Sequence, residues 1–138
     1  MRWSARRIAL PALFAVALSG CLDRSDHYDD INDARANHVF EKGWLPDMLP
    51  ASTYDLKVIT TVEDSTGRGR FRFDSKDYRA FSSNLSPYNS VMSKDDRDNK
   101  SIEQLLAKGY EAHTYSSSRG DWVFLCNPRE AICEFFVW

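Results

Sequence analysis

Alternating apolar and polar residues mark a first β-hairpin near the middle of the chain. In residues 56–63 and 68–73, one type of side chain recurs at every second position and alternates with the other type. A period of two is typical of a strand with one buried face, and residues 64–67 between the two stretches have the composition of a turn. We expect Phe71 and Phe73 to face the core, since both occupy the same side of the second strand. The opposite side then carries Arg68, Arg70 and Arg72.

Three further strands are predicted in the last third of the chain. Residues 111–116 alternate and lead into a turn at 116–120, whereas residues 122–125 and 134–138 carry apolar side chains on both faces. A sheet that is covered on one face only should carry polar residues on the other. Either the fold buries both faces of this hairpin, or one face is an aromatic surface for a protein partner. Such a surface would consist of Trp122, Phe124, Phe136 and Trp138.

Helical spacing of apolar residues predicts three helices. The first covers residues 30–42 and ends at Gly43, and the second covers residues 76–85 and ends before Pro87. The third begins at Ser101, which forms a capping box with Gln104, and ends at Gly109. Its apolar stripe consists of Ile102, Leu105 and Leu106.

These elements predict an α+β fold. Strands joined by short turns pair antiparallel, so we expect a sheet of about five strands with two or three helices on one face. The chain has 138 residues, which is enough for one domain, and we assign that domain to residues 31–138.

The first twenty residues predict an export signal. Arg2, Arg6 and Arg7 precede residues 8–18, a run without charge. This run is shorter than the roughly 20 residues of a transmembrane helix, and a positive start followed by a short apolar stretch is typical of a secretory signal.

The residues Leu18-Ser19-Gly20-Cys21 resemble the lipobox of bacterial lipoproteins. The resemblance implies that the Cys21 sulfur carries a diacylglyceryl group and that residues 1–20 are removed. Leu22, by resemblance to enterobacterial sorting, favours the periplasmic face of the outer membrane. We expect polar residues 21–30 to form a lipidated tether. The alternative is an ordinary secretory signal with an incidental cysteine.

Charge excludes one class of partner. The formal net charge is 18 − 20 = −2, and removal of the three signal-peptide arginines leaves 15 − 20 = −5. The chain therefore lacks the overall positive charge that is typical of a nucleic-acid-binding protein.

Cys126 and Cys133 form the remaining pair of the three cysteines. In an oxidising compartment such a pair is typical of a disulfide, here one that closes a hairpin. The alternatives are a redox pair or metal ligands, although redox motifs usually space their cysteines by two residues.

Motifs for catalysis are missing from the sequence. His27, His38 and His113 lie far apart without metal-ligand spacing, and residues 94–100 lack the glycine and distal glutamate of a calcium loop. We find no nucleophile elbow and no phosphate-binding glycine loop. We therefore expect no enzyme, no cofactor and no metal site.

Residues 43–50 form a proline-bracketed apolar loop, Gly43-Trp44-Leu45-Pro46 through Leu49-Pro50. This stretch resembles one in small bacterial lipoproteins, and the resemblance carries no activity with it. Trp44 and Leu49 either cap the core, or Trp44 lines a ligand groove.

The preferred hypothesis is a non-enzymatic, lipid-anchored periplasmic domain that binds a protein partner through the arginine face or the aromatic surface. An immunity or inhibitor protein against a periplasmic toxin is one use of such a domain. The alternatives are an accessory or structural lipoprotein of the envelope and a small-ligand binder that uses the Trp44 loop.

Overall fold

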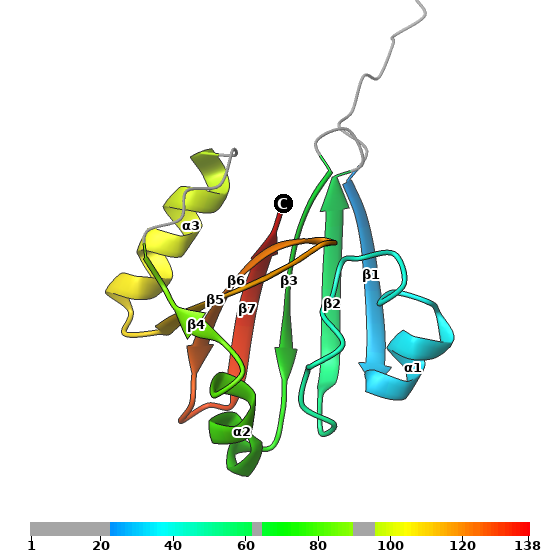
Figure 1. Ribbon diagram of the computed structural model, residues 1–138, viewed down its shortest axis with the longest axis horizontal. Helices are drawn as coiled ribbons and strands as arrows, with labels where there is room; N and C mark the ends of the chain where they lie inside the picture. The colour runs from blue at the N-terminus through cyan, green and yellow to red at the C-terminus, as the bar shows by residue number, and fades with distance from the viewer. Residues whose placement is uncertain (1–22, 62–64, 90–95) are drawn as a thin grey trace, which may run out of the picture.

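A computed structural model describes residues 23–61, 65–89 and 96–138, so the signal peptide and Cys21 lie outside the described residues. Seven strands of this part form one antiparallel sheet in the order β1-β2-β3-β7-β6-β5-β4 (Figure 1). The strands are β1 (Asp23–Asp30), β2 (Tyr54–Thr61), β3 (Thr66–Arg72), β4 (Ser86–Pro87), β5 (Glu111–Ser117), β6 (Gly120–Asn127) and β7 (Ile132–Val137). The helices are α1 (Ile31–Ala36), the 3₁₀ turn η1 (Ser75–Asp77), α2 (Tyr78–Ser82) and α3 (Asp96–Ala107).

The α+β class and the antiparallel sheet are confirmed, and all five predicted strands form. The sheet has two strands beyond the expected five, β1 and β4, one at each edge. Figure 1 shows α1 next to β1 and α3 at the opposite side of the molecule, beside β4 and β5.

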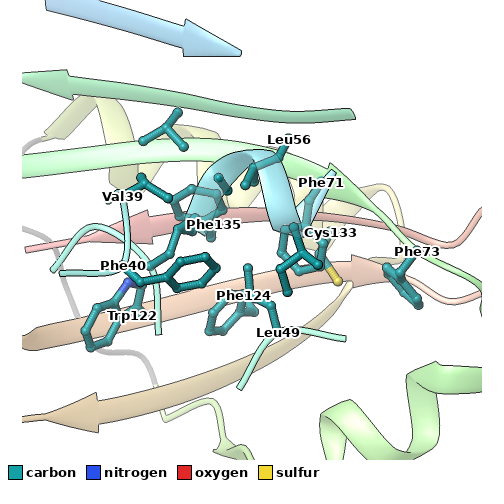
Figure 2. Packing of buried hydrophobic residues seen from close by; sticks show 14 of the residues in the cluster. Val39, Phe40, Leu49, Leu56, Phe71, Phe73, Trp122, Phe124, Cys133 and Phe135 are labelled. Atoms are coloured by element: carbon teal, nitrogen blue, oxygen red, sulfur yellow. The ribbon is translucent and has the colours of Figure 1, made fainter. Parts of the chain in front are cut away.

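The larger core lies on one face of the sheet. Phe71 and Phe73 are buried there, as the alternation predicted. The Phe71 ring centroid lies 5.9 Å from that of Phe81 in α2 and 6.4 Å from that of Phe135 in β7. Figure 2 shows the side chains of Phe40, Trp122, Phe124 and Phe135 gathered in this core.

A second, smaller core lies on the other face. Ile102 and Leu105 of α3 pack there against Val123, Leu125 and Phe136. Neighbouring residues of a strand point to opposite faces, so α3 and the larger core are separated by the sheet. Two helices, α1 and α2, cover one face of the sheet, as expected, whereas α3 covers part of the other face.

Residues 23–30 form an edge strand, where a tether was expected. β1 pairs with β2 along its length, and Tyr28, opposite Leu56, is 6% exposed and belongs to the larger core. A strand at the edge needs only backbone hydrogen bonds and a few inward apolar residues, so the other side chains of an edge strand are free to be polar. The acidic composition of this segment concealed the pairing.

All three helices have boundaries that differ from the prediction. α2 covers only Tyr78–Ser82 of the expected residues 76–85, and η1 precedes it. α1 ends at Ala36, and His38 has a left-handed φ of 59°, because the chain turns there to bury Val39 and Phe40. α3 begins at Asp96, so Ser101 lies inside the helix, where its hydroxyl donates to the Arg97 carbonyl at 2.9 Å. Its supposed capping box is therefore wrong.

Leu106 was also misplaced in the apolar stripe of this helix. It is 38% exposed, whereas Ile102 and Leu105 are buried. Only one side of α3 contacts the sheet, so the stripe is narrower than the sequence suggested.

The Cys126–Cys133 disulfide is confirmed. The two cysteines lie directly opposite each other in the β6–β7 pair, with their Cα atoms 4.1 Å apart. Closing a loop this short contributes about 2–3 kcal/mol of stability in the chain-entropy view.

Gly69 in β3 allows Phe135 to pack closely against the strand. A Cβ atom built on Gly69 would lie 2.7 Å from the Phe135 ring and 2.0 Å from the Lys57 carbonyl oxygen. The second contact is with backbone, which has little freedom to move. The glycine is therefore required by the packing of this sheet.

We predict that Gly69→Ala lowers the free energy of unfolding by about 3 kcal/mol or more, because a methyl group there overpacks the core against backbone. Urea unfolding followed by circular dichroism measures the change. Gly109→Ala is a useful comparison, since no atom lies within 4 Å of its built Cβ and only its φ of 85° opposes the change. Equal effects of the two substitutions would contradict the packing argument.

Candidate functional site

A groove of about 460 Å³ lies on the face of the sheet that carries α3. Strands β2, β3 and β7 form its floor, and α3 contributes one wall. Its lining residues are Lys57, Ile59, Arg68, Gly69, Arg70, Ser101, Glu134 and Phe136.

Strand register explains why these side chains meet. Leu56 and Val58 point into the larger core, so Lys57 between them points to the groove. Lys57 lies directly opposite Arg70, and Arg70 in turn lies opposite Glu134. The adjacent row across the same strands consists of Ile59, Arg68 and Phe136.

The three predicted arginines share one face, as expected, but two of them have acidic partners. The Arg68 guanidinium lies 3.8 Å from the carboxylate of Asp98, whose side chain is 5% exposed. The Arg72 guanidinium lies 3.7 Å from the Asp55 carboxylate. Arg72 also lies outside the groove. Arg68 and Arg72 are therefore partly neutralised within the fold.

Lys57 and Arg70 lack such an ion pair, although the charge of Asp55 acts on both of them at longer range. Neither forms an ion pair with any residue in the described ranges. Like charges directly opposite each other on neighbouring strands destabilise a sheet by roughly 0.2–1 kcal/mol. An anion bound between them would remove this repulsion, so the groove is suited to a negatively charged group.

Asp55 borders this cationic face from a β-bulge. Its φ is 47°, and the regular register of β2 with β3 is interrupted between Tyr54 and Lys57. A hydrogen bond with His27, at 2.9 Å between Nε2 and Oδ1, lowers the pKa of the Asp55 carboxyl, and the positive charges of Arg70 and Lys57 lower it further. Asp55 is thus held as an anion beside the groove.

The proposed aromatic surface is not assembled as one patch. Trp122 and Phe124 are 1% and 0% exposed in the larger core, Phe136 is 3% exposed on the other face, and Trp138 is partly buried near it. The structure therefore realises the first alternative, in which both faces of the hairpin are buried. Pairing of Cys126 with Cys133 sets Trp122 opposite Val137, so the four aromatic residues divide between the two faces.

Trp44 packs against the larger core, and its carbonyl accepts a hydrogen bond from the Trp122 indole Nε1–H at 3.1 Å. Leu49 in the same loop is buried. Both observations agree with a loop that caps the core. A second hollow of about 380 Å³ lies between this loop and β5, but its lining residues do not include Trp44; they are Leu45, Pro46, Asp47, Met48, Tyr115, Ser117, Ser118, Arg119 and Trp122.

The histidines remain apart, and each has an acidic neighbour. His27 contacts Asp55, and His38 lies 3.6 Å from Glu41. Within residues 23–61, 65–89 and 96–138, no group of three or more His, Cys, Asp or Glu side chains is arranged to hold a metal ion.

His113 belongs to a hydrogen-bonded group that joins α2 to β5. The Tyr78 hydroxyl donates to the Glu111 carboxylate at 2.5 Å and lies 3.0 Å from His113 Nε2. Since the single phenolic proton goes to Glu111, Nε2 of His113 is the donor of the second bond. Burial, followed by the bond to Glu111, raises the pKa of Tyr78. This network ties α2 to β5, the strand next to the edge strand β4.

Lys57 is the groove residue that the sequence interpretation missed. The signal was present, because Lys57 alternates with Leu56 and Val58 and must face away from the core. Glu134 and Ser101 could not be found in this way. Glu134 lines the groove because β7 lies next to β3 in the sheet, and Ser101 lines it because α3 packs on this face.

Fold and groove together define a small α+β domain with an open, cationic groove on one face of its sheet. A family model described as the YbbD head domain matches residues 24–72, which run from β1 to the end of β3 and include Lys57, Arg68 and Arg70. The match covers 49 of 138 residues, about a third of the chain. No curated protein and no solved structure matches the chain.

We predict that Tyr78→Phe reduces the loss of stability at alkaline pH. The raised pKa of Tyr78 means that the folded state holds the phenolic proton more tightly than the unfolded state, whose ordinary pKa is 10.0. The stabilisation is fully present below pH 10 and is lost as the pH rises above it. Urea unfolding at pH 8 to 11 measures the slope, and an unchanged slope in Tyr78→Phe would contradict the assignment.

Proposed function

We propose that this chain is a lipid-anchored lipoprotein of the bacterial envelope that binds a protein partner without catalysing a reaction. The proposal for its location is supported by the export signal in residues 1–20 and by the lipobox that ends at Cys21. Two or more acyl chains on one cysteine make membrane attachment stable, whereas one chain is marginal. In the described part of the chain, no helix is long and apolar enough to cross a membrane.

The basic groove carries the proposal for binding. Lys57 and Arg70 lie side by side without ion pairs among the described residues, on a protein whose net charge is −2. Such a local reversal of charge steers and orients a complementary surface. Ile59 and Phe136 add apolar contact area, which a protein side chain would cover.

One use of such a domain is immunity: a small tethered protein that covers a toxin acting in the periplasm. A domain of this kind needs a complementary surface and an anchor in the right compartment, and it needs no catalytic group. An accessory role in envelope assembly is the alternative, and the identity of the captured partner distinguishes the two.

We predict that a palmitate analogue labels the wild-type protein and does not label Cys21→Ala. The thiol of Cys21 is the attachment point that the lipobox implies, so its removal leaves no acceptor. Bacteria expressing either form are labelled and the protein is examined by fluorescence in a gel. Cys133→Ala provides a control for non-specific labelling of thiols, and equal labelling of wild type and Cys21→Ala would contradict the anchor.

We predict that Arg70→Glu reduces capture of the partner from envelope extracts by at least about tenfold, because it places an acid beside Glu134 and reverses the charge of the groove. Arg79→Glu is the matched control, since Arg79 is an exposed arginine in α2 that does not line the groove. Quantitative mass spectrometry compares the captured proteins. Identical partners and yields for both variants would contradict a role of the groove.

A further inference from the structure

We infer that the groove recognises an acidic side chain of a protein partner, with its carboxylate between Lys57 and Arg70 and an adjoining apolar residue on Ile59 and Phe136. This inference rests on the proposed function, because it names the chemistry of the partner at the same site. Because the inference concerns only the acidic group that the groove binds, a short acidic peptide can test it without the partner.

The other two arginines on this face already have acidic partners. Arg68 is held by the buried Asp98, and Arg72 is held by Asp55. Lys57 and Arg70 are the two groove cations that lack an ion pair within the described residues, and they are directly opposite each other. Their positions on adjacent strands let both side chains reach one carboxylate, which accepts hydrogen bonds at two oxygens.

The lining of the groove carries an excess of positive charge. The lining residues Lys57, Arg68 and Arg70 contribute +3 and Glu134 contributes −1, which gives +2. Asp98 and Arg97 border the neighbouring hollow together with Arg68 and contribute −1 and +1, so the excess stays positive. A groove with an excess of positive charge suits an anionic group such as a carboxylate.

The shape of the groove and the charges around it favour a protein side chain as the ligand. The site is a groove with Ile59 and Phe136 in its lining, so it offers apolar contact beside the two cations. A membrane of anionic lipids is attracted by a broad basic surface, whereas this protein has a net charge of −2, Glu134 lines the groove, and the Asp55 carboxylate lies near its two cations. An acidic segment of a protein is therefore favoured over a lipid surface.

Nuclear magnetic resonance of the full-length protein in nonionic detergent tests the inference. The probe is the peptide acetyl-Leu-Glu-Leu-amide, and its isosteric control is acetyl-Leu-Gln-Leu-amide. We expect the glutamate peptide to shift backbone signals of residues 57–59, 68–70 and 134–136 and the side-chain Nε–H signal of Arg70. The glutamine peptide should bind about tenfold more weakly, since a charged acceptor makes the stronger hydrogen bonds.

Variants separate recognition from folding. Lys57→Gln and Arg70→Gln should each weaken binding of the glutamate peptide about tenfold, and Arg79→Gln should leave it unchanged. Neither groove variant should lower the melting temperature appreciably, because the repulsion between Lys57 and Arg70 that each removes offsets the attraction to Asp55 and, for Arg70, to Glu134 that is lost with it. A purely structural role would predict the opposite, a lower melting temperature.

Four outcomes would overturn the inference. These are equal binding of the two peptides, shifts confined to residues away from the groove, an equal response of the same residues to inorganic phosphate, and a stronger response to vesicles containing phosphatidylglycerol. Failure of the proposed function would be seen elsewhere, as missing lipid on Cys21 or as capture that does not depend on Arg70. Peptide recognition would stand in either of those cases.

Discussion

The pairing of β6 with β7 is the constraint on which the rest of this structure depends. Cys126 opposite Cys133 sets the register of the hairpin, and this register sends Phe124 and Phe135 into the larger core. The alternate residues of the same strands form the smaller core under α3. Because a slip by one residue would exchange the two faces, a covalent link across the hairpin protects both cores at once.

The groove is a consequence of the same pairing. β7 lies next to β3, so its outward residues Glu134 and Phe136 lie beside Arg70 and Arg68. The helix α3 packs over the neighbouring part of the sheet and brings Asp98 to Arg68. The charged groove thus lies where α3 leaves the sheet uncovered, beside the apolar area that the helix covers.

Much of the fold was readable from local patterns, and the failures have physical reasons. Strong alternation with aromatic residues identified the central strands, and the arginine face followed from the burial of Phe71 and Phe73. The edge strand β1 was missed because its pairing depends on backbone groups, which are the same for every residue. The start of α3 was missed because Ser101 has the composition of a cap, while its hydroxyl bonds a carbonyl within the helix.

By itself, the sequence determined the short-range features: the alternating strands, the hairpin disulfide, and the side of β3 on which Arg68, Arg70 and Arg72 lie. Tertiary structure alone decided which of those arginines is available, because Asp98 and Asp55 reach them from distant positions. It also placed Lys57 opposite Arg70 and divided the aromatic residues of the C-terminal hairpin between two faces. The alternation of side chains between the two faces of a strand is a local property of the chain, whereas register and strand order are set by the packing of the whole sheet.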